Sequence, residues 1–235
     1  MSSFVLVHGA WHGSWCWKRV RQLLQAEGHD VFTPTLTGVG ERSHLISPQV
    51  NLETHVADVA NVIRWEELAD VVLCGHSYGG CVITGVADRV PERLYSLVYL
   101  DAFILENGQS LHDVLPREMA EAQVRGARES GDGWRVPAIS AEFFQVNLAD
   151  RPWMDRQCTP QPLATFQQRL RVDTTFPAER CTHILATGYE QSPFPPFHEI
   201  AKARHWKTLA IDCGHDVMLD KPAELAAMLR GAARP

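Results

Sequence analysis

A serine between two glycines has the residue types and spacing needed for nucleophilic attack on a carbonyl group. Residues 75–79 read Gly-His-Ser-Tyr-Gly, which fits the pattern Gly-x-Ser-x-Gly. An apolar run, 70–74, comes before it and a stretch with helical spacing follows, as expected for a sharp strand-to-helix turn that lifts the hydroxyl above a sheet. Glycines at both ends let the chain fold back without side-chain collisions. The sequence therefore predicts Ser77 as a nucleophile.

A serine hydroxyl is nearly unreactive at neutral pH, so the nucleophile needs a general base. His215 is the candidate, because it follows directly after Gly214 in a loop near the end of the chain. The apolar run 206–211 predicts a strand before this loop, and Pro222 marks the start of a helix after it. A histidine between the last strand and the last helix is well placed to take the proton of Ser77.

The Gly-rich loop 8–13 follows an apolar run near the start of the chain that we predict to be a buried strand. A backbone N–H from such a loop pairs with the N–H of the residue after the serine to bind a developing oxyanion. The predicted donors are Ala10 and Tyr78. We expect His8 to brace the loop, and the sequence leaves open whether His12 does the same or lines the pocket.

These motifs make the chain resemble the α/β-hydrolase superfamily, over 7–15, 75–80, 97–103 and 214–216. It is most similar to the branch with plant methylesterases, salicylate-binding esterases, hydroxynitrile lyases and their small bacterial esterase relatives. The resemblance implies an α/β-hydrolase fold: a mostly parallel central sheet, helices on both faces and an inserted, largely helical cap. It also implies a Ser-His-acid enzyme that uses no cofactor and no metal.

The acid of this triad has two candidates. The family usually carries an aspartate after the last strand but one, and here the strand predicted at 183–187 is followed by Glu190 as the one carboxylate. Asp101 ends the strand after the nucleophile helix, and catalytic groups of open α/β sheets gather at the carboxyl ends of strands. We predict Asp101 as the acid, with Glu190 as the alternative. Either one would orient the imidazole and stabilise its protonated form.

The chain has 235 residues, of which 45% are hydrophobic, and a net charge of −6. The length suits one sizeable α/β domain, and the negative charge argues against nucleic acid or a membrane as partner. A small-molecule substrate is expected, and the sequence leaves a homodimer open. The six cysteines are spread out, and the first strand starts at once with no signal segment before it. Reduced thiols and a cytoplasmic location are therefore expected, with Cys74 and Cys81 as buried apolar residues.

Strands and helices alternate regularly along the first half of the chain, with amphipathic helices at 17–26 and 51–64. The rhythm breaks at 103–180, which we predict to be a cap inserted into a core made of 1–102 and 181–235. Helices are predicted at 116–129 and, from a start in 159–163, through 170, with a break at 131–133. Aromatic and aliphatic candidates to line a tunnel above Ser77 are Phe103, Leu105, Trp134, Phe143, Phe144, Trp153 and Phe166.

We expect a serine hydrolase that cleaves carboxylic esters of small, fairly apolar molecules through an acyl-enzyme. One alternative is a hydroxynitrile lyase-like or other non-hydrolytic enzyme of the same fold. Such lyases carry a lysine directly after the histidine, and Asp216 in that place cannot supply positive charge for departing cyanide. The other alternative is a small-molecule binding protein with weak turnover.

Overall fold

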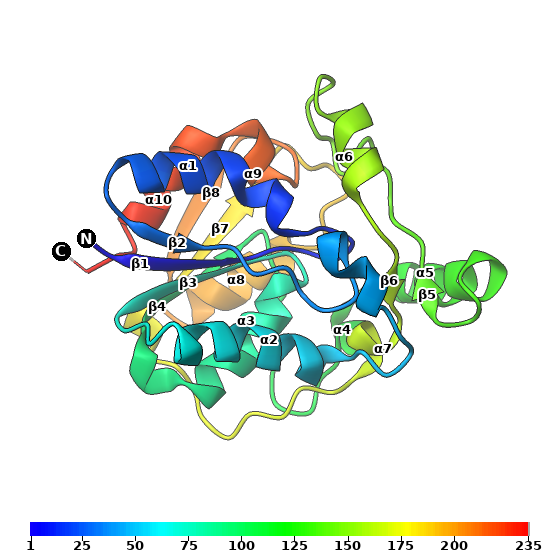
Figure 1. The fold of residues 1–235 in the computed structure, drawn as a ribbon, viewed down its shortest axis with the longest axis horizontal. Coiled ribbons are helices and arrows are strands. Elements are labelled where there is room, and N and C mark those ends of the chain that lie inside the picture. The colour runs from blue at the N-terminus through cyan, green and yellow to red at the C-terminus, as the bar shows by residue number, and fades with distance from the viewer. Residues whose placement is uncertain (235) are drawn as a thin grey trace.

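The computed structural model describes residues 1–234 and is built on one six-stranded sheet (Figure 1). All neighbouring strands are parallel, in the order β2-β1-β3-β4-β7-β8, which confirms the predicted fold class. The central strands are buried on both faces, as expected for a sheet covered by helices on either side. The strands are β1 (Ser3–Val7), β2 (Asp30–Phe32), β3 (Val71–His76), β4 (Leu94–Leu100), β7 (Cys181–Ala186) and β8 (Lys207–Ile211).

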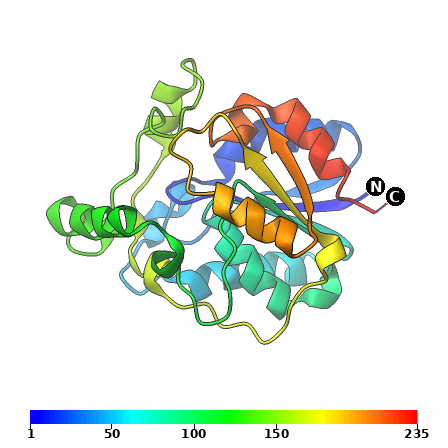
Figure 2. The same cartoon turned by 180° about the vertical axis from the view of Figure 1, so that it is seen from behind.

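Helices cover both faces of the sheet. One face carries α1 (Lys18–Ala26), α9 (Val217–Asp220) and α10 (Pro222–Arg230). The other carries α2 (Leu52–Trp65), α3 (Gly79–Arg89) and α8 (Pro195–Ala203) (Figures 1 and 2). The predicted helices at 17–26 and 51–64 are confirmed to within a residue, and α2 begins at a capping box formed by Asn51 and Thr54. Short 3-10 helices lie at Ser14–Trp17, Gly40–Leu45, Pro91–Arg93 and Ala178–Arg180.

The chain between β4 and β7 is called here the inserted segment (103–180). Most of it lies away from the two termini, beyond the carboxyl ends of the strands, and its last part runs back past α3 to the start of β7 (Figures 1 and 2). The predicted helix at 116–129 is confirmed as α5, which ends at Gly131. The second predicted helix is shorter than expected because Gln168 is extended. The elements of the inserted segment are α4 (Leu111–Val114), α5 (Arg117–Ser130), β5 (Arg135–Val136), α6 (Arg151–Gln157), β6 (Gln161–Pro162) and α7 (Ala164–Gln167).

Two features of the fold differ from the sequence-based expectation. The strand expected at 183–187 begins two residues earlier, and β5 and β6 form a small antiparallel pair that was not predicted. A two-residue strand has too few residues to show an alternating pattern, so periodicity could not reveal it. In residues 1–234, no helix is long and apolar enough to cross a membrane.

Candidate active site

Ser77 lies on a sharp turn between β3 and α3. Its φ angle is 55°, a left-handed conformation that is unusual for a residue with a side chain and that marks functional sites. A Cβ atom on Gly75 would collide with the carbonyl oxygen of Gly79, and one on Gly79 would lie 2.8 Å from the carbonyl oxygen of Val7. The glycines of the motif are therefore required by close backbone packing, as predicted.

His215 lies in the loop between β8 and α9, and its backbone is held on both sides. Its N–H donates to the carbonyl oxygen of Phe144 at 2.9 Å, and its own carbonyl oxygen lies 3.1 Å from His76 Nε2. His215 and Ser77 line the same cavity. Within residues 1–234 no hydrogen bond joins Ser77 Oγ to His215 Nε2, and catalytic hydrogen bonds of this kind are often long when no substrate is bound.

The structure brings Asp101 to His215. Asp101 Oδ2 lies 2.6 Å from His215 Nδ1, and both side chains are buried. Asp101 follows β4 directly with a φ angle of 41°, and its Oδ1 accepts a 3.1 Å hydrogen bond from the N–H of Ala186 on the neighbouring strand. Glu190 is exposed, and its backbone N–H donates to Gln145 Oε1 instead. Of the two acids considered from the sequence, Asp101 is the one in contact with His215.

Burial controls the charge of the His215–Asp101 pair. Desolvation lowers the pKa of His215 to about 4, which keeps the imidazole neutral and able to accept a proton at pH 7. Burial raises the pKa of the Asp101 carboxyl, while hydrogen bonds from Ala186 and from His215 favour its ionised form. The Phe194 ring stacks on His215 with 4.9 Å between centroids and 10° between planes. That ring face would stabilise the imidazolium once it forms.

The loop 8–13 approaches the serine closely at Gly9. A Cβ atom there would lie 3.0 Å from Ser77 Cβ and 2.9 Å from His76 Nδ1. His8 braces this loop, as predicted: its Nδ1 lies 2.8 Å from the carbonyl oxygen of Gly9, and its Nε2 accepts from the N–H of Leu36. Ala10, from this loop, and Tyr78 line the cavity that holds Ser77 and His215.

The peptide that joins Ala10 to Trp11 is held from both sides. Its carbonyl oxygen lies 2.7 Å from His12 Nδ1, and its N–H donates to Gln161 Oε1 at 3.1 Å. Trp11 has a φ angle of 65°, so these contacts maintain a strained backbone. Sequence reasoning missed Gln161, because its contact with Trp11 joins residues that are 150 positions apart.

A buried ion pair connects this loop to the histidine loop. His12 Nε2 lies 2.9 Å from Asp216 Oδ1, at a geometry that is not aligned for a hydrogen bond. Desolvation alone would lower the pKa of His12, but the Asp216 carboxylate outweighs it and raises the pKa. His12 in turn holds the pKa of Asp216 below its ordinary value against the effect of burial. Thus His12 is a brace of the loop, the first of the two roles left open by the sequence.

The cavity at Ser77 and His215 is narrow, with a volume of about 40 Å³, and has a mostly apolar lining. Phe103, Phe144 and Phe166, which were expected to line it, do so. Leu105 and Phe143 line other cavities, and neither Trp134 nor Trp153 borders this one. An apolar lining of this kind suits a small, fairly apolar ligand.

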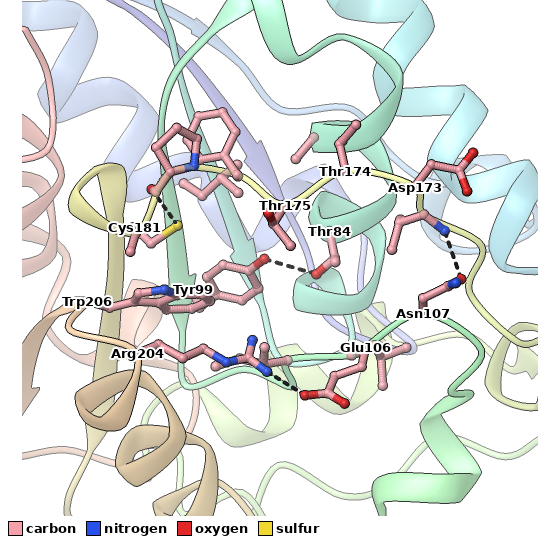
Figure 3. Close-up of a pocket in the computed structure, with 18 residues that line it drawn as sticks. Thr84, Tyr99, Glu106, Asn107, Asp173, Thr174, Thr175, Cys181, Arg204 and Trp206 are labelled. Carbon is pink, nitrogen blue, oxygen red and sulfur yellow. Dashed lines mark hydrogen bonds and ion pairs between the residues drawn. The ribbon is translucent and has the colours of Figure 1, made fainter.

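A larger cavity of about 820 Å³ lies between α3, β4 and the end of α8 (Figure 3). Its polar groups are bonded to one another: Thr84 to Tyr99 at 3.0 Å, and Arg204 to Glu106 at 2.7 Å. Neither Ser77 nor His215 borders it. The smaller cavity is therefore the candidate active site, because it combines a nucleophile with a base and the larger one does not.

The cysteines near the serine offer no rival nucleophile. Cys74 and Cys81 are fully buried on β3 and α3, and burial raises the pKa of both thiols. A protonated, buried thiol is inert. In residues 1–234, no group of three or more His, Cys, Asp or Glu side chains is arranged to hold a metal ion.

The comparisons with known proteins agree with this geometry. The model of the alpha/beta hydrolase family matches residues 4–228. The carbendazim hydrolyzing esterase of Nocardioides sp. strain SG-4G is 47% identical over 239 aligned residues, covering 97% of this chain and 98% of that protein. Salicylic acid-binding protein 2 of Nicotiana tabacum is 35% identical over 185 residues, covering 74% of this chain and 68% of that protein.

A solved structure extends the likeness to the whole molecule. An extracellular alpha/beta-hydrolase from a Paenibacillus species superposes with a TM-score of 0.85 at 25% sequence identity, and 100% of each chain is covered. The predicted similarity to salicylate-binding and other esterases of this superfamily is confirmed. This chain belongs to the alpha/beta hydrolase family.

Proposed function

We propose that this chain hydrolyses carboxylic esters of small, fairly apolar molecules with Ser77 as nucleophile, His215 as base and Asp101 as the orienting acid. The observation that carries the proposal is the 2.6 Å contact between Asp101 and His215 beside a cavity that also holds Ser77. Ester hydrolysis as the class of reaction is also supported by an esterase relative at 47% identity over nearly the whole chain.

The proposed reaction has two halves. Ser77 Oγ attacks the ester carbonyl carbon while its proton passes to His215 Nε2, and the protonated imidazole then donates that proton to the departing alcohol. A water molecule next gives its proton to His215 and attacks the acyl-serine, which releases the acid and restores the serine hydroxyl. Asp101 holds His215 in the tautomer with a proton on Nδ1 throughout.

The backbone N–H groups of Ala10 and Tyr78 are the proposed oxyanion hole. Both residues line the cavity, and in residues 1–234 neither N–H donates a hydrogen bond to the protein. Free donors that face a reacting carbonyl can stabilise the charge that develops on its oxygen. The His12–Asp216 pair and Gln161 support this role because they fix the peptide next to the Ala10 donor.

The inserted segment is proposed to act as a cap. Leu111 of α4, Leu115 directly after it, Met119 of α5 and Ile139 all border the cavity at Ser77. A cover of this kind excludes water and strengthens the electrostatic interactions inside the site. We propose cap boundaries at 103 and 180, just outside β4 and β7.

Carbamate esters belong among the first substrates to test. The Nocardioides relative is named for the hydrolysis of carbendazim, a methyl carbamate carried by a flat, bicyclic heteroaromatic ring. The aromatic lining of the cavity, with Trp11, Phe144 and Phe166, suits a flat ring. We propose that carbendazim or a related carbamate is hydrolysed by the same serine.

A lyase activity is not favoured. Asp216 occupies the position after His215, and its charge is balanced by His12, so no free positive charge is available there for a departing cyanide. A reducing compartment such as the cytoplasm is our proposal for location. It is supported by the six free cysteines, of which Cys16, Cys74, Cys81 and Cys181 are buried.

The proposal is tested by replacing and labelling the serine. Wild type should hydrolyse 4-nitrophenyl acetate, and a fluorophosphonate should modify Ser77, which peptide mass mapping can locate. Ser77→Ala should lose nearly all turnover and all labelling, with an unchanged circular dichroism spectrum. Turnover by folded Ser77→Ala at the wild-type rate would refute the proposed nucleophile.

A further inference from the structure

Two cavities share a wall next to the candidate active site. The inner cavity holds Ser77 and His215, and an outer cavity of about 460 Å³ lies between α5 and the chain that follows β5. The residues that line both are Trp11, Met119, Gln123 and Ile139. Three of these are apolar, and Gln123 is the one with a hydrogen-bonding amide. Gln123 is thus a polar group placed at the junction of two otherwise mostly apolar spaces.

The Gln123 amide is oriented by a neighbouring histidine. His112 Nε2 lies 2.9 Å from Gln123 Oε1, and burial lowers the pKa of His112, which keeps its imidazole neutral at pH 7. A neutral imidazole with the proton on Nε2 donates to Oε1 and leaves the two amide N–H groups of Gln123 as donors. Within residues 1–234 no acceptor binds them. Gln123 is 9% exposed and lines both cavities, so a ligand that accepts a hydrogen bond can reach its amide there.

The outer cavity favours neutral, apolar groups. Its lining includes Val136, Pro137 and Phe143, and its one charged side chain is the carboxylate of Glu118. No lysine, arginine or histidine borders it, so nothing there would balance an anionic group. Met119, in the shared wall, is unbranched and adaptable, so a ligand can pass from one cavity to the other when this side chain changes rotamer.

We propose that the outer cavity is a second substrate subsite, which takes the non-reacting half of the ester when that half is a flat, neutral ring system with a hydrogen-bond acceptor for Gln123. The inference rests on the proposed function, because it assumes that the reacting carbonyl lies at Ser77. It assigns Gln123 as a specificity-determining residue and leaves the chemical step to the triad.

A matched pair of esters tests the subsite. Methyl quinoline-6-carboxylate carries a ring nitrogen as acceptor, and methyl naphthalene-2-carboxylate has the same shape without it. In wild type, the quinoline ester should have the higher kcat/KM. In Gln123→Met the ratio between the two esters should fall about tenfold, as expected for one lost hydrogen bond in a dry site. A ratio that stays at the wild-type value would overturn the role of Gln123.

A second variant tests the space itself without altering a buried residue. Ala122 is exposed and lines the outer cavity, so Ala122→Trp should fill it and lower kcat/KM for both bicyclic esters about tenfold relative to 4-nitrophenyl acetate. Arg128→Trp, at an exposed α5 position that does not line this cavity, should keep the wild-type ratio. An unchanged ratio in Ala122→Trp, with acetate still hydrolysed, would overturn the subsite alone. Failure of wild type to hydrolyse any ester would overturn the proposed function and the subsite together.

Discussion

His215 is suited to act as a base by its surroundings more than by its position in the chain. Phe144, Tyr189 and Phe194 lie around it with ring centroids at 5.2, 5.3 and 4.9 Å, so water has little access to the imidazole. Burial lowers the pKa of the side chain, and Asp101 holds its Nδ1 proton. The imidazole is therefore neutral before the reaction. In the proposed mechanism it becomes protonated when it receives the proton of Ser77, and Asp101 then stabilises the charged ring.

The depressed pKa of His215 predicts the acid limb of the pH profile. The base works only when neutral, so activity is present above its pKa and is lost as the pH falls through it. Because burial lowers this pKa, kcat/KM for a neutral ester should be level from pH 7 to pH 8 and fall only in acid, as the pH drops through the pKa of His215. Initial rates measured by chromatography in mixed buffers, on enzyme shown to be folded by circular dichroism, give this profile. A half-maximum near pH 7 would contradict the assigned environment of His215.

Four loops deliver the site, each from the carboxyl end of a parallel strand, and the one after β8 carries His215. The loop after β1 carries Ala10, the turn after β3 carries Ser77, and Asp101 follows β4. Ser77 and Asp101 both adopt positive φ angles, so the chain stores strain where it places functional groups. The close approach of Gly9 to Ser77 fixes the distance between the first two loops.

Gly9→Ala tests how tightly these loops are fitted. The added methyl group would lie 2.9 Å from His76 Nδ1 and 3.0 Å from Ser77 Cβ, so the loop or the serine must shift. We expect kcat for 4-nitrophenyl acetate to fall about 100-fold, since misplacement of reacting groups by an ångström has effects of that size.

The control for Gly9→Ala is Gly108→Ala. Gly108 has a φ angle of 81°, and no atom lies within 4 Å of the position that a Cβ atom would take. This variant should lose about 1 kcal/mol of stability from backbone strain alone and keep its kcat within twofold. A folded Gly9→Ala with the wild-type kcat would show that the close approach is not needed for catalysis.

At the scale of the whole molecule, the inserted segment is fastened to the core on the side of α1. The Arg19 guanidinium binds both carboxylate oxygens of Asp150 at 2.6 and 2.7 Å and also donates to the carbonyl oxygen of Leu219 in α9. Asn147 adds a 2.7 Å hydrogen bond to Asp220. Phe144 lies three residues before Asn147, and its carbonyl oxygen accepts a hydrogen bond from the His215 N–H. The segment thus contributes to the position of the base.

Arg19→Ala should loosen this attachment. We expect a loss of about 1 kcal/mol in the free energy of unfolding, because the ion pair is bidentate but partly exposed. Amide hydrogen exchange across 141–149 should become faster, which mass spectrometry can follow. Arg117→Ala, which removes an exposed pair with Glu121 on α5, should change neither quantity. Unaltered exchange at 141–149 in Arg19→Ala would contradict the attachment.

The sequence reveals those parts of the site that depend on local chain geometry. The turn at Ser77 is readable because only glycine fits at its ends, and Asp101 is readable because strand ends in a parallel sheet converge. The His12–Asp216 pair and the Phe194 stack could not be foreseen, since each joins residues far apart in the sequence and depends on how loops pack. The sequence marks Asp216 only as an aspartate at the position after the histidine, where hydroxynitrile lyases carry a lysine.

The central claim is that Asp101, from the strand after the nucleophile helix, serves as the acid of the triad. The most direct test is kcat/KM for 4-nitrophenyl acetate with wild type, Asp101→Asn and Glu190→Gln, all shown to be folded. We predict a fall of about 10,000-fold for Asp101→Asn, because the imidazole would lose its correct tautomer. Glu190→Gln should stay within twofold of wild type. Collapse of Glu190→Gln together with an active Asp101→Asn would contradict the account.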